Sequence, residues 1–101
     1  MDGAPDMLAQ IIQIYLNDTP KLLGQLNESI AAGDAPGVQR AAHSLKSSSA
    51  NLGALQLSDF CKTLETNGRE AALEEAPQLF AQIEVEFVRV EEVLAVEIGA
   101  E

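Results

Sequence analysis

The sequence is poor in the residue types on which several large classes of protein depend. It has one cysteine, no tryptophan and only 4% aromatic residues. One cysteine excludes an internal disulfide framework and a cysteine-based zinc site. Basic residues are also few, with six Lys and Arg against 16 Asp and Glu and a formal charge of −10. Such a chain is unsuited to neutralising phosphates, so we expect no nucleic-acid binding and no adhesion to anionic membranes.

Long hydrophobic runs are missing as well. No apolar stretch approaches the roughly 20 residues that a membrane-spanning helix needs. The opening residues 1–5 lack the basic and apolar regions of a signal peptide. We therefore expect a cytoplasmic protein without direct membrane contact. Hydrophobic content is nevertheless 47% of 101 residues, which is enough for one core, so we expect a single domain over residues 1–101.

The apolar residues recur at helical spacing along almost the whole chain, and Ala, Leu, Glu and Gln dominate. Short turn and cap signals divide the pattern: Thr19-Pro20, Gly33-Asp34, Gly53 and Asn67-Gly68. Short connections between helices favour antiparallel neighbours. We predict an all-α, antiparallel up-down four-helix bundle with an additional short N-terminal helix. Its core would cover about residues 19–96, with the N-terminal helix in 1–18 flanking the functional site.

One segment, Ala41–Gly53, carries a pattern that points to chemistry, because it holds the only histidine in the chain. On a helix His43, Lys46 and Ala50 would share one face, while Leu45 would lie about 200° around the axis. If Leu45 faces the core, the imidazole faces solvent. An exposed neutral imidazole, which titrates near about pH 6.5, is a nucleophile able to take a phosphoryl group reversibly.

The neighbours of His43 suit a phosphorylated ring. Lys46 lies one turn along and would offset the added negative charge. Ser47 and Ala50 are small, so another protein could bring its active site close to the ring. The sequence has no glycine-rich nucleotide loop and no Walker motif. We therefore expect a module that carries a phosphoryl group but cannot take one from ATP unaided.

At these residues the sequence resembles the histidine phosphotransfer (HPt) family of two-component phosphorelays. The family pattern is His-x-Leu-Lys-Gly, then small residues, a Gly and an apolar-rich helix. Here it reads His43-Ser44-Leu45-Lys46-Ser47-Ser48-Ser49-Ala50-Asn51-Leu52-Gly53-Ala54, followed by Leu57, Cys61, Leu64 and Glu65. The resemblance covers roughly residues 19–94.

The resemblance implies a role for each matching residue. His43 would be phosphorylated on Nε2, Lys46 would screen the phosphoryl group, and Gly53 would end the helix. The small residues at positions 47 and 50 would keep the docking surface open. The family often has Gly after the Lys, whereas this chain has Ser47. The Ser47 hydroxyl could donate to the phosphoryl group, or bond back to the His43 carbonyl.

The resemblance also implies partners. Response-regulator receiver domains would give and take the phosphoryl group, and they would supply the magnesium, so no cofactor or metal of its own is expected. A hybrid sensor kinase is the expected upstream protein, with this chain either separate from it or part of its cytoplasmic region. We expect a monomer, although the long last helix could pair with a copy of itself.

A receiver-docking surface is expected beside the histidine. The first helix would contribute Ile12 and Tyr15, and the histidine helix would contribute Arg40 and Ala50. Two adjacent isoleucines cannot both point inward, so one of Ile11 and Ile12 would be partly exposed; packing of the first helix is the equal alternative. No acidic residue lies between Asp34 and Asp59, which predicts a neutral to basic surface around His43.

Two other functions fit parts of the sequence. A non-transferring adaptor (a pseudo-HPt) would have the same fold without using His43. An acyl carrier is also a small acidic helical protein, but it needs a serine in an Asp-Ser-Leu context at a helix start, where this chain has His43-Ser44-Leu45 in mid-helix.

Overall fold

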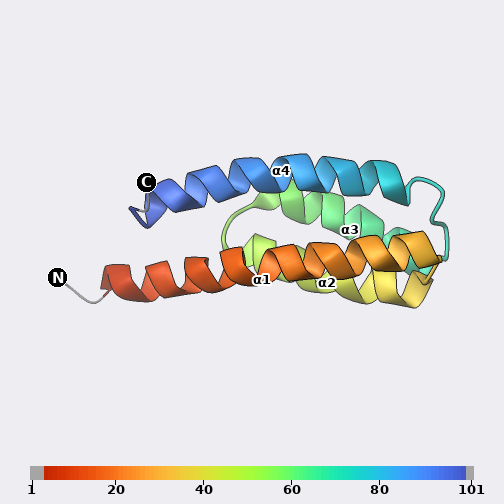
Figure 1. The fold of residues 1–101 in the computed structure, drawn as a ribbon, viewed down its shortest axis with the longest axis horizontal. Helices are drawn as coiled ribbons and strands as arrows, with labels where there is room; N and C mark the ends of the chain where they lie inside the picture. The colour runs from red at the N-terminus through yellow and green to blue at the C-terminus, as the bar shows by residue number, and fades with distance from the viewer. Residues whose placement is uncertain (1–3, 100–101) are drawn as a thin grey trace.

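The computed structural model describes residues 4–99 and contains four α-helices joined by short turns (Figure 1). They are α1 (Ala4–Ala32), α2 (Ala35–Asn51), α3 (Leu55–Arg69) and α4 (Ala76–Glu97). Successive helices run in opposite directions, so the predicted all-α, up-down four-helix bundle is confirmed. The opening residues 1–3, part of the segment without signal-peptide features, lie outside the described residues.

The additional short N-terminal helix is not confirmed, because α1 runs without a break through Thr19-Pro20. Thr19 does not cap a new helix; its side chain is buried and its hydroxyl donates to the Tyr15 carbonyl at 2.7 Å. Proline inside a helix removes one backbone hydrogen bond. Here the inward face continues on both sides of the proline, with Ile12 and Leu26 both buried, and this packing keeps the helix whole.

The core runs along the inner faces of all four helices. Its fully or nearly buried residues are Ile12, Tyr15, Leu26, Val38, Ala41, Ala42, Leu45, Leu57, Cys61, Leu64, Ala76, Phe80, Ile83, Phe87 and Leu94. Burial raises the pKa of the Cys61 thiol to about 12. The single cysteine therefore acts as a small hydrophobic residue rather than as a nucleophile.

Helices α2 and α3 approach each other most closely, and small residues make this possible. An added Cβ at Gly68 would lie 2.7 Å from the Gln39 amide nitrogen and 3.0 Å from the Ala35 carbonyl oxygen. At the other end Gly53 has φ +79°, a left-handed conformation, and the chain turns there into α3. The Ser58 hydroxyl then donates to the Lys46 carbonyl at 3.0 Å. These contacts set the register in which α3 faces the histidine segment of α2.

Two helices continue past the α2–α3 turn. The N-terminal part of α1 and the C-terminal part of α4 extend beyond it at one end of the molecule (Figure 1). The Tyr15 and Phe87 rings meet edge to face between them, with centroids 6.0 Å apart. In residues 4–99 no helix combines the length and hydropathy required to cross a bilayer.

Candidate functional site

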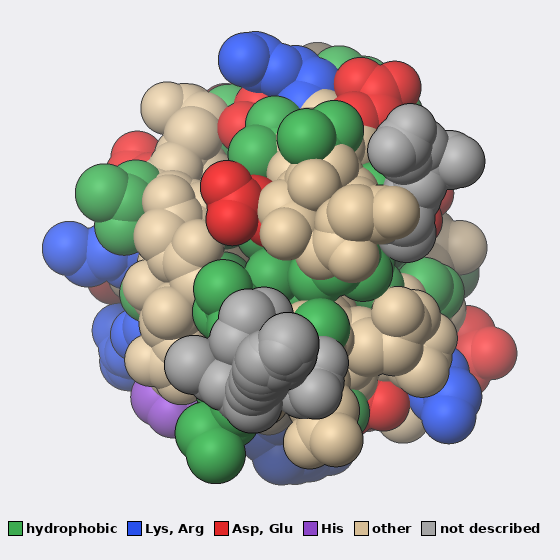
Figure 2. Space-filling model, turned by 90° about the vertical axis from the view of Figure 1, so that its left-hand side faces the viewer, with side chains coloured by type: hydrophobic (Ala, Val, Ile, Leu, Met, Phe, Trp, Pro, Cys, Tyr) green, Lys and Arg blue, Asp and Glu red, His purple; other side chains and the backbone are tan. Residues whose placement is uncertain are grey.

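His43 lies near the middle of α2 and points away from the core. Its side chain is 60% exposed, whereas Leu45 is completely buried on the opposite face. The end-on view shows the histidine, in purple, at the surface of the bundle, with Lys or Arg side chains above it (Figure 2). The predicted outward direction of this face of α2 is therefore what the structure has.

The histidine ring is held by a carboxylate from the neighbouring helix. Glu65 of α3 places Oε2 2.8 Å from His43 Nδ1 and Oε1 2.7 Å from Lys46 Nζ. Arg69, one turn further along α3, places Nη2 3.5 Å from Glu65 Oε2. We call His43, Lys46, Glu65 and Arg69 the histidine network.

Glu65 is the centre of this network and is nearly buried, with 8% of its side chain exposed. The hydrogen bond from Lys46 is the main reason that the pKa of Glu65 lies below its ordinary value, with a further contribution from His43; desolvation opposes both. Glu65 is therefore ionised at neutral pH. An ionised carboxylate only accepts hydrogen bonds, so the proton between it and His43 sits on Nδ1. In the neutral ring, the lone pair is then on Nε2.

The surface around His43 includes one carboxylate that the neighbouring sequence does not reveal, although cations outnumber it. Residues 35–58 indeed carry no acidic side chain, but α3 brings Glu65 directly against the ring. Packing decides this, because the carboxylate is 22 residues away along the chain. Lys46 is paired with that carboxylate and is only 30% exposed.

A shallow hollow of about 440 Å³ opens beside the ring. Its lining residues come from α2 and α3: Gln39, Arg40, His43, Ser44 and Glu65. Arg40 is exposed on the α2 turn before His43, so this hollow has a cation at its edge. It is open to solvent and large enough to admit a phosphoryl group.

The small residues beyond His43 fall into two groups. Ser47 and Ala50 are exposed on the histidine side of α2. Ser49 is fully buried, and its hydroxyl lies 2.8 Å from the Tyr15 hydroxyl. Ser44 lies in the interior of α2, not at a helix start as an acyl-carrier serine would.

The first helix places its isoleucines differently from the expected docking surface. Ile12 is 2% exposed and Tyr15 is 5% exposed, so both belong to the core and neither presents an exposed docking side chain. The exposed members are Ile11 and Ile14, at 50% and 59%. The prediction that one residue of the Ile11-Ile12 pair would be exposed is confirmed, but Ile12 was the wrong choice. Helical spacing explains why Ile12 is the buried one of the pair, because it lies on the same inner face of α1 as Tyr15 and Thr19.

Ile11 and Ile14 border a groove of about 310 Å³ between α1 and the second half of α2. Leu22, Leu52 and Ser48 also line this groove. Ser44 lines both the groove and the hollow beside His43, so the two openings are neighbours. An apolar groove and the reactive ring are thus adjacent on one side of the bundle.

Sequence reasoning missed Glu65 as a site residue. A signal was present, since Leu57, Cys61 and Leu64 form the apolar stripe of α3 and Glu65 follows at the spacing of the same inward side. A carboxylate beside a buried stripe needs a partner, and the chain offers a single histidine. Only the α2–α3 register shows that the two meet. Across residues 4–99, no group of three or more His, Cys, Asp or Glu is arranged to hold a metal ion.

Comparisons with known proteins agree with this geometry. The family model described as "Hpt domain" matches residues 10–94. A crystal structure of histidine-containing phosphotransfer protein B (HptB) from Pseudomonas aeruginosa PAO1 is similar, with a TM-score of 0.88 and 33% sequence identity. The match covers 92% of this chain and 81% of that one. No curated protein sequence matches the chain significantly.

Proposed function

The chain belongs to the Hpt domain family and is a histidine phosphotransfer intermediate of phosphorelays, and from this premise we propose that His43 is the residue that carries the phosphoryl group. One observation carries the proposal. His43 is the only histidine in the chain, it is 60% exposed, and its Nδ1 is occupied by Glu65, which leaves Nε2 open to solvent.

The proposed reaction is a reversible transfer between Nε2 and an aspartate of a receiver domain. The Nε2 lone pair attacks the phosphorus of the receiver's aspartyl phosphate, the P–O bond to the aspartate breaks, and the P–Nε2 bond forms. The proton on Nδ1 stays in place, so the phosphorylated ring is cationic. Glu65, 2.8 Å away, stabilises that charge. The reverse step passes the group to the next receiver.

Lys46 and the two arginines offset the charge of the phosphoryl group itself. A phosphoryl group adds roughly two negative charges. Lys46 and Arg69 neutralise Glu65 and leave one positive charge over, and Arg40 adds another at the edge of the hollow. We propose that Lys46 uses its remaining N–H groups on the phosphoryl oxygens. Ser47, exposed on the next turn, keeps the approach open and could donate one further hydrogen bond.

The receiver would dock across the α1–α2 side of the bundle. Hpt domains interact with response-regulator receiver domains, and we propose that a receiver binds at the apolar groove beside His43. Ile11 and Ile14 take the anchoring role that we had expected of Ile12 and Tyr15, because they are exposed at the groove. Arg40 and Ala50 lie exposed on α2 to either side of His43, where a docked receiver would contact them.

The remaining parts of the proposal concern context. We propose that the phosphoryl group comes from the receiver domain of a hybrid sensor kinase, that the chain has no ATP site of its own, and that magnesium is supplied by the receiver. We also propose that the chain acts in the cytoplasm and as a monomer. The acidic surface supports the monomer, because two copies would repel each other.

The decisive experiment uses His43→Gln, which keeps a polar side chain of similar size at an exposed position. Receiver domains carrying labelled aspartyl phosphate are mixed with the wild-type and the variant chain. We expect acid-labile label on the wild type and none on the variant. Phosphorus NMR of the labelled wild type should show the Nε2 rather than the Nδ1 adduct.

The matched control is Gln78→Ala, which alters an exposed residue of α4, a helix that does not pack against α2, and should still accept label. Acid-labile phosphate on His43→Gln would overturn the proposal. If no receiver labels the wild type while receivers still bind it, the chain is an adaptor. Thermal unfolding of each variant confirms that the fold is intact.

A further inference from the structure

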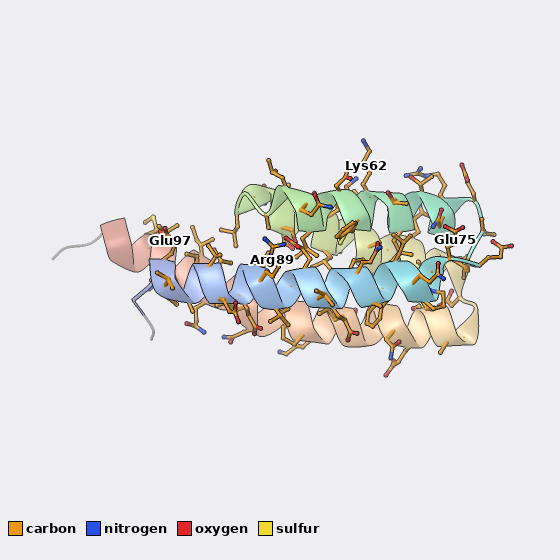
Figure 3. The ribbon with its side chains drawn as sticks, turned by 90° about the horizontal axis from the view of Figure 1, so that it is seen from above. Lys62, Glu75, Arg89 and Glu97 are labelled. Carbon is orange, nitrogen blue, oxygen red and sulfur yellow. The ribbon has the colours of Figure 1, made fainter. Side chains whose placement is uncertain are left out.

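Helix α4 has apolar residues on two opposite faces, and the bundle buries only one of them. Its inner face holds Phe80, Ile83 and Phe87 in the core. Four valines on its outer side are largely exposed: Val85 at 66%, Val88 at 52%, Val93 at 63% and Val96 at 75%. We call these four the outer valine face. Among the helices of residues 4–99, α4 packs only against α3 and α1, and the exposure of the four valines shows that neither covers this side. Figures 1 and 3 show α4 at the outside of the bundle.

The folded bundle does not explain these valines. A β-branched residue is less favourable in a helix than Ala, Glu or Gln, and exposure leaves its methyl groups in water. Single exposed hydrophobic residues are ordinary, but these four lie on the same side of α4. They form two i,i+3 pairs, Val85/Val88 and Val93/Val96, with exposed Arg89 and Glu92 between the pairs. A surface helix with a second apolar strip is suited to a second packing partner.

A hollow beside the strip offers an anchoring point. It has a volume of about 350 Å³ and lies between α3 and α4. Its apolar lining comes from Phe60 of α3 and from Ala81 and Val85 of α4, and its polar lining from Gln82, Glu86 and Arg89. Figure 3 shows Arg89 on the side of α4 that faces α3. An apolar side chain of a partner would fit here, as interface anchors usually do.

The charges around the strip indicate what kind of partner fits. Helix α4 carries five glutamates and one arginine, and the arginine is occupied by Glu86 at 3.4 Å. Glu92 lies between the two valine pairs, and Glu84, Glu91 and Glu97 lie beside them; all four glutamates are exposed. A second copy of this chain would set glutamates against glutamates, which opposes the self-pairing considered from the sequence. A basic partner would be attracted instead.

The outer valine face is separate from the phosphotransfer side. Helix α4 packs against α3 and α1 and not against α2, which carries His43. We propose that the outer valine face binds an amphipathic helix of a partner protein, with apolar residues at heptad spacing flanked by Lys and Arg. The module can then stay attached through α4 while His43 meets a receiver.

The test uses two synthetic helices of about three heptads, each labelled with a fluorophore. Both have Leu at positions a and d; one has Lys at e and g and the other has Glu there. We expect the lysine peptide to bind the full chain at least tenfold more tightly than the glutamate peptide, and its affinity to fall as salt is raised. Fluorescence anisotropy measures both.

The variant Val88→Gln/Val93→Gln should weaken lysine-peptide binding at least tenfold. The control Ile14→Gln changes an equally exposed apolar residue on α1 and should leave binding unchanged. A second pair, Val85→Gln/Val96→Gln, repeats the test should the first variant unfold. Equal affinity for the two peptides, or loss of binding in Ile14→Gln alone, would overturn the proposal.

Light scattering of the chain without peptide tests whether a second copy of the chain occupies the outer valine face. A wild-type dimer that becomes a monomer in the valine variant would show that it does, and would overturn the proposal. The peptide assay does not depend on His43. A phosphorylated receiver should label the valine variant as it labels the wild type. Loss of peptide binding can therefore be distinguished from loss of phosphotransfer at His43.

Discussion

Glu65 is the single residue that joins the reactive histidine to the rest of the bundle. Its two oxygens contact His43 and Lys46 at 2.8 and 2.7 Å, and Arg69 stands 3.5 Å away. A nearly buried carboxylate is costly to desolvate unless cations and hydrogen bonds compensate for it. The same contacts that stabilise Glu65 therefore fix the orientation and the tautomer of the His43 ring.

Replacing Glu65 by Gln should slow phosphotransfer. The amide oxygen can still accept from Nδ1, but it cannot stabilise the positive ring, and Lys46 loses its partner. We expect the transfer rate to fall on the order of tenfold, as for other side chains that orient a functional histidine. Rapid-quench kinetics with a phosphorylated receiver measures it. Glu70→Gln, an exposed glutamate at the end of the same helix, is the control, and equal rates in the two variants would contradict the role of Glu65.

Glu65 should also make stability depend on pH in the acid range. Its pKa in the folded chain lies below the ordinary value of 4.5, so the unfolded state takes up protons first as the pH falls. The stabilisation is complete above about pH 4.5 and is lost below it, as the pH falls through the folded-state pKa. Urea unfolding should therefore show a larger advantage of wild type over Glu65→Gln at neutral pH than at about pH 3. A constant difference at both pH values would refute this.

Among the secondary-structure elements, the α2–α3 pair decides the geometry of the site. Gly68 lies at their closest approach, where a Cβ would come 2.7 Å from the Gln39 amide nitrogen. Backbone atoms cannot move aside as a flexible side chain can, so a methyl group there must push the helices apart. Glu65 lies one turn before Gly68 on α3, so its contact with His43 depends on this spacing.

Gly68→Ala should accordingly destabilise the chain by about 1–3 kcal/mol through overpacking and slow phosphotransfer as well. Gly24→Ala provides the matched control, because a Cβ at Gly24 of α1 meets nothing within 4 Å. Alanine is the better helix former there and should stabilise by about 1 kcal/mol. Urea unfolding measures both, and a stabilising Gly68→Ala would show that the helices are less tightly packed than described.

For the whole molecule, the dominant property is its charge of −10, concentrated on α4 and the turn before it. Like charges on a compact surface repel, and dissolved salt screens them. We expect the melting temperature to rise by a few degrees between about 0.01 M and about 0.5 M NaCl. Circular dichroism measures the transition. A fall over that range would mean that screened ion pairs outweigh the relieved repulsion.

Local patterns in the chain predicted the class of fold and the position of the reactive group. The helical spacing of apolar residues predicted the four-helix bundle, together with a fifth short helix that is in fact part of α1. The offset of about 200° from Leu45 predicted an exposed His43. The Thr19-Pro20 signal failed, because local cap preference competes with burial, and the inner face of α1 from Ile12 to Leu26 continues across the proline. Likewise, adjacency alone could not say which of Ile11 and Ile12 is buried.

The sequence by itself determined the elements and the single histidine, since periodicity, caps and residue chemistry are local properties. The tertiary structure alone decided what surrounds that histidine. Glu65 lies 22 residues from His43, and only the close α2–α3 approach at Gly68 brings them together. The same holds for α4, because only the assembled bundle shows that its valine side is left exposed. Contacts between distant residues depend on register and packing, and no local pattern encodes these.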